Sequence, residues 1–227
     1  MRVRERIAAA AERAGRRADD VLLIAVSKTM EASVVKEAID AGVEALGENR
    51  VQEAKAKIGE LRHPVPWHLI GHLQTNKVKD ALACFDVIQT VDRLDVALEI
   101  QKRAGRRLDV LLEVNVANEP QKSGFAPDAV AAALDAIAGM PNLNVRGLMA
   151  IPPVVERPED SRPAFRALRE LAKRHNLEQL SMGMSGDFEV AIEEGATMVR
   201  VGTAIFGPRT LNMGAPQLRT PKPPRPL

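Results

Sequence analysis

The sequence has little cysteine, few aromatic residues and no excess of either charge. Its single cysteine, Cys84, cannot form an internal disulfide, so nothing points to an oxidising compartment. Aromatic residues make up 3% of the 227 residues, with one Trp and no Tyr, which disfavours a small all-β fold built on aromatic cross-strand pairs. The formal net charge of +2 gives no support for nucleic acid or a membrane surface as a partner.

Long apolar runs are also missing. No run reaches membrane-spanning length, and the amino terminus is charged where a signal peptide would have its apolar core. We therefore expect a cytoplasmic protein. The length allows one large domain, and a core of Ala, Leu, Val and Ile suits helices that alternate with parallel strands.

The stretch Val21–Lys28 is the strongest local signal. An unbroken apolar run rich in Val, Leu and Ile ends at Ser27 and Lys28, as in a strand that is buried on both faces. An amine therefore lies at the carboxyl end of a strand, where α/β folds place their chemistry. Burial lowers the proton affinity of a lysine, which suits Schiff-base formation with an aldehyde. The alternative is a lysine that extends to solvent just past the strand.

Eight strands alternating with helices are predicted along the chain. The strands are expected at 21–28, 44–49, 67–71, 86–91, 109–116, 145–151, 179–185 and 198–205. Thr29 and Asp92 are predicted to cap the helices that follow their strands. This count and spacing predict a single (β/α)8 barrel over residues 1–208, preceded by an extra helix at residues 1–17. Residues 209–227 are rich in proline, and we expect a disordered tail there.

The main competitor is an open, doubly wound sheet. Its dinucleotide-binding version loses support because no Gly-x-Gly-x-x-Gly follows the first strand.

In a barrel, the strand ends share one rim, and polar residues are predicted to gather there. The expected rim residues are Lys28, Glu48, Asn49, His68, His72, Asp92, Asn115, Met149, Ser185, Arg200 and Thr203. Each residue alone is a weak indication of a site. His68 can equally be a buried core histidine with a hydrogen-bond partner.

Two members of this rim form a candidate phosphate site. Residues 181–187 run from a strand into a helix, with Gly186 allowing close backbone approach and Ser185 offering a hydroxyl. On the next strand, Gly202 and Thr203 can add donors to the same anion. The alternative is a pair of tight turns with helix caps.

Arg200 lies between valines on the last strand, so its side chain points into the barrel mouth on the same face as Gly202. It can pair structurally with Glu113 or Glu48, or it can donate to a ring nitrogen of a cofactor. A reactive lysine, a phosphate site and an arginine for a pyridine nitrogen together indicate pyridoxal 5′-phosphate (PLP).

Several stretches also resemble the PLP homeostasis protein family. They are residues 25–29 (AVSKT), 47–53 (GENRVQE), 68–77 (HLIGHLQTNK), 147–152 (GLMAIP), 180–188 (LSMGMSGDF) and 199–207 (VRVGTAIFG). The resemblance implies a barrel of the alanine racemase N-terminal-domain type that holds PLP as a Schiff base and has no assigned catalytic reaction. It also implies a role in PLP, vitamin B6 and amino-acid homeostasis.

Carried over by motif, Lys28 would form the aldimine with PLP, and Asn49 would lie beside the ring. Ser185, Gly186, Gly202 and Thr203 would bind the phosphate, and Arg200 would face the ring nitrogen.

Lys122 matches a lysine of the family in the loop after the fifth strand. Glu31 stands where the family often has proline, which affects the helix start rather than the cofactor. The expected partners are PLP and, as recipients of the cofactor, PLP-dependent apoenzymes. We expect a monomer.

The sequence favours a carrier over an enzyme. Relatives that racemise alanine use a tyrosine as a second base and have a second β domain, whereas this sequence has no tyrosine and no residues to spare for such a domain. An arginine at the ring nitrogen keeps the pyridine unprotonated and weakens it as an electron sink.

Two alternatives stay open. One is a PLP-dependent racemase or lyase with Lys28 as its only base. The other is a Schiff-base aldolase for a phosphosugar, which would be colourless where bound PLP gives a visible absorption band.

Overall fold

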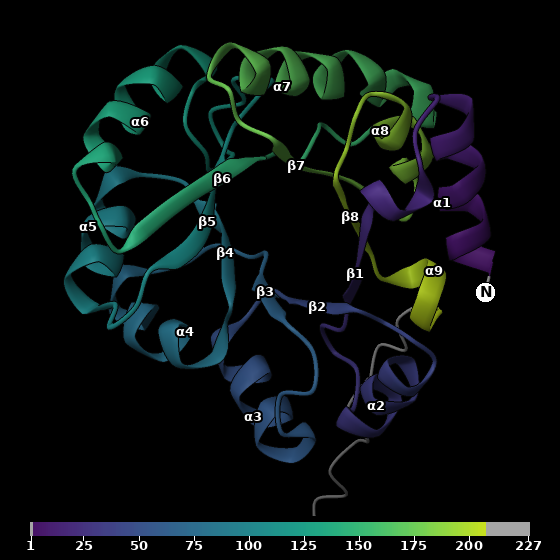
Figure 1. The fold of residues 1–227 in the computed structure, drawn as a ribbon, viewed down its shortest axis with the longest axis horizontal. Helices are drawn as coiled ribbons and strands as arrows, with labels where there is room; N and C mark the ends of the chain where they lie inside the picture. The colour runs from purple at the N-terminus through teal and green to yellow at the C-terminus, as the bar shows by residue number, and fades with distance from the viewer. Residues whose placement is uncertain (1, 208–227) are drawn as a thin grey trace, which may run out of the picture.

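The computed structural model describes residues 2–207, and its centre is a closed barrel of parallel strands in chain order, as Figure 1 shows. The strands are β1 (Leu22–Val26), β2 (Ala45–Glu48), β3 (Trp67–Leu69), β4 (Val87–Val91), β5 (Leu108–Glu113), β6 (Leu143–Met149), β7 (Gln179–Met184) and β8 (Met198–Val201). The predicted (β/α)8 barrel is therefore confirmed, and the open-sheet alternative is wrong.

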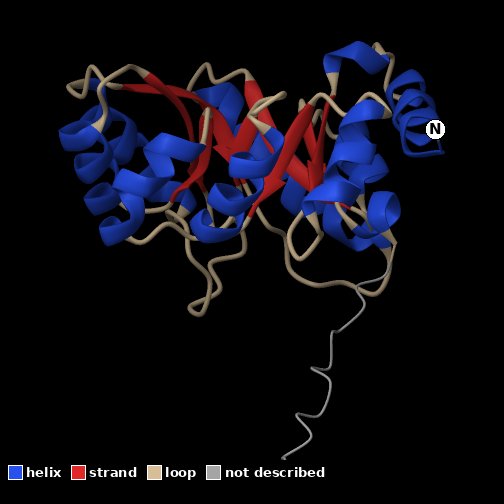
Figure 2. Cartoon of the chain, turned by 90° about the horizontal axis from the view of Figure 1, so that it is seen from below, coloured by secondary structure: helices blue, strands red, loops and turns tan. Residues whose placement is uncertain are grey.

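Helices surround the barrel on its outside (Figures 1 and 2). They are α1 (Arg2–Arg13), α2 (Ala32–Asp40), α3 (Val51–Leu61), α4 (Val78–Cys84), α5 (Leu94–Arg103), α6 (Val130–Ala138), α7 (Arg162–Arg174), α8 (Phe188–Glu193) and α9 (Thr203–Phe206). Single turns of 3-10 helix occupy Ala18–Asp20, Thr75–Lys77, Pro127–Ala129 and Pro158–Ser161. The predicted N-terminal helix is α1, which lies against α8.

Strand β1 closes the ring because it pairs with β2 on one side and β8 on the other. Its residues Leu23–Val26 are buried, as the apolar run predicts for a strand with packing on both faces. Side chains that point outward from the barrel join those of the helices in one large apolar core. A smaller apolar cluster is separate from it and consists of Ile24, Ala45, Leu111, Met149 and Met198. With the period of two in a strand, this second cluster belongs to the barrel interior.

Three local predictions are wrong. Thr29 has a φ of 67°, so it is not the cap of α2, and Glu31 takes the N-cap position instead. Arg93 rather than Asp92 precedes α5. Strand β8 ends at Val201, because the backbone turns at Gly202 and the next residue begins α9.

The expected boundary at residue 208 stays a prediction, since the tail at 209–227 lies outside the described residues. Within residues 2–207, no helix combines the length and the apolar character needed to cross a bilayer.

Candidate functional site

All of the residues predicted to bind the cofactor line one cavity at the carboxyl ends of the strands. The cavity has a volume of about 260 Å³. Its lining residues are Val26, Lys28, Asn49, Ile70, Ile151, Met184, Ser185, Gly186, Arg200, Gly202 and Thr203. The structure thus brings together elements from both ends of the chain, because β1 and β8 are neighbours in the closed barrel.

The charge of this cavity is positive. Lys28 and Arg200 both line it, and none of its described lining residues is acidic. Hydroxyl groups and backbone amides stand on the side formed by β7 and β8. This donor set fits an anionic ligand that has both a phosphate and an apolar ring, since Val26, Ile70 and Ile151 supply apolar walls.

The end of β7 is shaped by glycine. Gly183 has a φ of 89°, and a Cβ there would approach the Cβ of Ala191 to 2.5 Å. This tight turn places Ser185 beside the start of α9, where its Oγ accepts hydrogen bonds from the backbone N–H of Gly202 at 3.2 Å and of Ala204 at 3.4 Å. The hydroxyl and the amides therefore share one small region of the cavity wall.

Asn49 follows β2 and is held by a close approach of two loops. A Cβ at Gly71 would lie 2.3 Å from the backbone oxygen of Asn49, so only glycine lets the chain after β3 pack here. The side-chain Oδ1 of Asn49 is buried and has no hydrogen-bond partner. A buried acceptor without a partner is costly, which favours a ligand with a donor at this point.

A buried ion pair fixes the backbone before Lys28. Lys57, on α3, donates to the carbonyl oxygen of Ser27 at 2.6 Å and to Glu48 Oε1 at 2.5 Å. The Ser27 hydroxyl donates to the same carboxylate oxygen at 2.8 Å. Burial raises the pKa of Glu48, and Lys57 opposes that rise.

Lys57 was missed from the sequence. It lies on the side of α3 that also buries Val51 and Ala54, but a lysine is rarely buried unless it is paired, so its position alone did not indicate a buried amine. Only the closed fold reveals that its amine reaches the end of β1.

Arg200 is buried, with 4% of its surface exposed. Its Nη1 donates to Ser181 Oγ at 2.7 Å, and its Nη2 donates to the carbonyl oxygen of Ala150 at 2.9 Å. Burial lowers the pKa of Arg200 to about 10, and the nearby charge of Glu113 opposes the decrease. The guanidinium is therefore still cationic at neutral pH.

The predicted partners of Arg200 need correction. Glu48 does not pair with it, because that carboxylate belongs to Lys57. Glu113 acts on Arg200 through its charge, whereas the hydrogen bonds go to Ser181 and Ala150.

His68 is a core histidine and not a rim residue. It is 4% exposed, and its Nδ1 lies 2.8 Å from Nε2 of Gln89, which is itself fully buried. Desolvation lowers the pKa of His68 to about 4. The sequence offered one signal for Gln89 and Ser181, since each is a polar residue inside a mostly apolar strand.

A second cavity of about 320 Å³ adjoins the first and shares Asn49, Ile70 and Ile151 with it. Glu113 lines this cavity, and burial together with the neighbouring charge of Asp92 raises its pKa to about 7.

Two other rim residues predicted from the sequence, His72 and Asn115, line this second cavity. Asp92 accepts a hydrogen bond from Arg93 and lies 2.9 Å from His72 Nδ1. Lys122, which matched a lysine of the family, lines the cavity, donates to the carbonyl oxygen of Pro152 and forms an ion pair with Glu119.

Comparison with known proteins places this barrel in a family. The family model for the alanine racemase N-terminal domain matches residues 2–210. An alanine racemase of Clostridium difficile has the same fold, with a TM-score of 0.65 at 16% identity, over 82% of this chain and 51% of the racemase.

More similar proteins have a more specific name. A pyridoxal phosphate homeostasis protein of Aquifex aeolicus is 49% identical over 92% of this chain and 96% of its own length. PipY of Synechococcus elongatus, solved with PLP bound, has a TM-score of 0.79 and 36% identity, over 90% of this chain and all (100%) of PipY. The resemblance predicted from the motifs is confirmed: the chain belongs to the pyridoxal phosphate homeostasis protein family and is built on the alanine racemase N-terminal domain.

Proposed function

We propose that this protein binds PLP in the 260 Å³ cavity, joined to Lys28 as a Schiff base, and that it carries and releases the cofactor. The observation that carries the proposal is the composition of that cavity. It combines a lysine at the end of β1, a buried arginine and a set of hydroxyl and amide donors, without an acidic residue among its described lining residues. The relative PipY, which was solved with PLP bound, supports this choice of ligand.

We expect different residues to contact different parts of the ligand. Ser185, Gly186, Gly202 and Thr203 would hold the phosphate, since their side chains and amides are clustered on one wall. Arg200 would donate to the ring nitrogen from the barrel interior. The orphaned Oδ1 of Asn49 would accept a hydrogen bond at the ring's edge.

PLP supplies an aldehyde that links to amines and, when its ring nitrogen is protonated, an electron sink. Arg200 works against the second of these, because its terminal nitrogens only donate and its charge is permanent near neutral pH. The chain also contains no tyrosine, the residue that alanine racemases use as a second base. Both features favour a carrier that regulates the supply of PLP, with PLP-dependent apoenzymes as its recipients.

One observation favours a second candidate function, a PLP-dependent enzyme that acts on amino acids. Glu113 lies in the adjoining cavity with a pKa raised to about 7, which suits proton transfer near neutral pH. The two functions differ in whether the α-hydrogen of an amino acid exchanges with solvent.

The test is to treat the protein as isolated with borohydride, which fixes a Schiff base, and to map the modified lysine by mass spectrometry. We expect the adduct on Lys28, and we expect Lys28→Ala to lose both the adduct and the visible absorption band. Lys77→Ala is the matched control and should keep both. An adduct on Lys77 or Lys122, with Lys28 unmodified, would overturn the assignment.

The carrier role is tested by α-hydrogen exchange. Amino acids incubated in heavy water with the PLP-loaded protein should incorporate deuterium no faster than with free PLP at the same concentration. Rapid deuterium incorporation that depends on Glu113 would contradict the carrier role and support the enzyme.

A further inference from the structure

A row of polar side chains crosses the interior of the barrel and ends at Arg200. The Arg200 guanidinium donates to Ser181 Oγ at 2.7 Å, and Ser181 Oγ donates to Gln89 Oε1 at 2.6 Å. Gln89 Nε2 then lies 2.8 Å from His68 Nδ1. The row, hereafter the interior row, joins strands β8, β7, β4 and β3.

The chemistry of each group fixes the direction of the row. A guanidinium can only donate, so the Ser181 oxygen accepts from Arg200 and its own hydrogen goes to Gln89. The Gln89 amide nitrogen is then the donor to His68 Nδ1, which must be the unprotonated ring nitrogen. Burial lowers the pKa of His68 to about 4, in agreement with a neutral ring.

The members of the row have few other partners among the described residues, and Arg200 also donates to the carbonyl oxygen of Ala150. Ser181 and Gln89 are fully buried, and His68 and Arg200 are each 4% exposed. Gln89 Nε2 also donates to Met198 Sδ at 3.5 Å, and a thioether sulfur is a weak acceptor. If Ser181 is lost, Nη1 of Arg200 therefore loses its hydrogen-bond partner in a buried place.

The interior of such a barrel is ordinarily filled by layers of branched apolar side chains. A polar row that spans it is the costlier choice, because every member has to be satisfied. The one member that lines the Lys28 cavity is Arg200. Its guanidinium plane is fixed at two points, by Ser181 on one terminal nitrogen and by the carbonyl oxygen of Ala150 on the other.

We propose that Ser181, Gln89 and His68 are positioning residues, which hold the Arg200 guanidinium at the angle that lets it donate to the ring nitrogen of the cofactor. This inference rests on the proposed function and extends it to side chains that do not line the cavity. Ser181 bonds Arg200 directly, Gln89 fixes the Ser181 hydroxyl, and His68 fixes the Gln89 amide.

The test compares PLP with its 1-deaza analogue, in which a C–H replaces the ring nitrogen. Dissociation constants for both ligands are measured on the unmodified protein and on Ser181→Ala, and their ratio gives the preference for the nitrogen. The unmodified protein should prefer PLP by about ten-fold or more, the size of one charge-assisted hydrogen bond. Ser181→Ala should reduce that preference to about two-fold, because an Arg200 that is no longer held makes a poorer bond.

A merely structural role would weaken both ligands equally and leave the ratio unchanged. Thr197→Val is the matched control, because it removes a hydroxyl that bridges to β7 at Leu180, outside the interior row. It should keep the full preference. Ser181→Thr restores a hydroxyl and should restore the preference. Gln89→Met keeps the volume but cuts the row one step further away, and should lower the ratio in the same direction; it serves as the test if Ser181→Ala does not fold.

The outcomes separate the two proposals. If the unmodified protein binds neither ligand, the proposed function fails. If it prefers PLP but Ser181→Ala and Gln89→Met keep that full preference, the positioning role is wrong and PLP binding stands. If the unmodified protein binds both ligands equally, Arg200 does not contact the ring nitrogen and the positioning role is overturned as well.

Discussion

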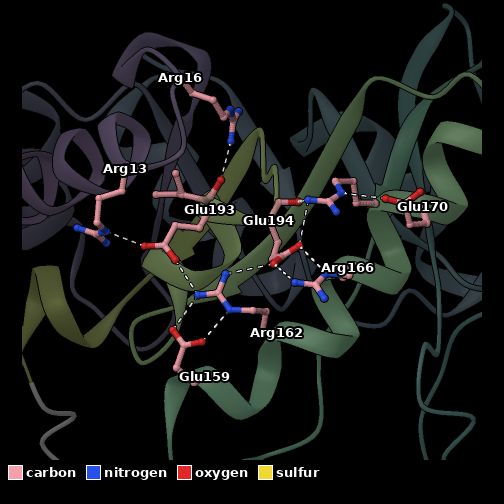
Figure 3. A network of polar contacts seen from close by, with 10 residues as sticks. Arg13, Arg16, Glu159, Arg162, Arg166, Glu170, Glu193 and Glu194 are labelled. Carbon is pink, nitrogen blue, oxygen red and sulfur yellow. Dashed lines mark hydrogen bonds and ion pairs between the residues drawn. The ribbon is translucent and has the colours of Figure 1, made fainter.

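The mouth of the barrel and the outer face of helices α7 and α8 are both rich in charge, but they arrange their partners differently. On the outer face, Glu194 meets the guanidinium groups of Arg162 at 3.1 Å and Arg166 at 2.9 Å, as Figure 3 shows. It also meets that of Arg169 at 3.0 Å. Arg162 also pairs with Glu193, which is shared with Arg13 of α1. At the mouth, Glu48 has a single cationic partner, Lys57, and each member of the interior row bonds mainly to the next.

In the outer network, the central glutamates therefore share several cationic partners. At the mouth, each polar group depends mainly on one partner. Removing one arginine outside still leaves Glu193 or Glu194 with another cation, and the glutamate that pairs with Arg162 alone, Glu159, is exposed to water. Removing one group at the mouth leaves a buried charge or donor alone, and its desolvation is no longer compensated. The same number of polar contacts can thus differ greatly in what each contributes to stability, and substitutions can measure that difference.

The largest effect is expected for Lys57→Met. The change leaves Glu48 buried without its cation and removes the donor to the Ser27 carbonyl oxygen. We expect a loss of about 3–5 kcal/mol in the free energy of unfolding, measured by urea denaturation. Lys55→Met on the same helix is the control, because Lys55 forms an exposed pair with Asp80 and should change the stability by less than about 1 kcal/mol. Equal effects of the two substitutions would contradict the dependence of Glu48 on a single cationic partner.

An intermediate and pH-dependent effect is expected at Glu113. The folded protein raises the pKa of this carboxyl from 4.5 to about 7, so it holds the proton more tightly than the unfolded chain does. The stabilisation is fully present below pH 4.5 and is lost as the pH rises through 7. Glu113→Gln mimics the protonated form, so the variant should gain stability over the unmodified protein between pH 5 and pH 8, by at most about 3 kcal/mol.

Denaturation of both proteins at several pH values measures this difference. A constant difference across the range would mean that Glu113 is ionised throughout, and the acid–base candidate function would lose its support.

The smallest effect is expected for Arg162→Ala on the outer face. Glu193 keeps Arg13, and Glu194 keeps Arg166 and Arg169. We expect a loss of about 1 kcal/mol or less, which should shrink further in high salt because the pairs are partly exposed. A loss as large as that of Lys57→Met would show that the outer network is not redundant.

The barrel could be predicted from the sequence because each strand carries its own signal. The apolar runs and the turns after them gave the number and order of the strands, and strand ends in a closed parallel barrel share one rim. Helix starts were harder to predict. Thr29 and Asp92 have good capping side chains, but Thr29 adopts a positive φ and Asp92 bonds Arg93.

The sequence predicted which site residues lie at strand ends. It did not predict which hydrogen-bond partners their side chains reach. The period of two placed Arg200 inside the barrel, although its hydrogen bonds go to Ser181 and Ala150 and not to the glutamates that the sequence offered. Lys57 was missed, because its place on the buried side of α3 does not indicate that its amine reaches Glu48 on β2. Pairings between distant segments become visible only when the segments are packed.

The turn at Ser185 affects the affinity with which the cavity binds any anion. Its Oγ already accepts the N–H groups of Gly202 and Ala204, so an incoming anion at this wall competes with a protein oxygen for the same hydrogens. The net gain is then the difference between two bonds and not the worth of a new one. A site whose donors are already hydrogen-bonded to a protein oxygen binds an anion less tightly than a site whose donors have no partner. The anion therefore dissociates from it at a lower free-energy cost. Such reversibility suits the proposed role of a carrier that releases its ligand.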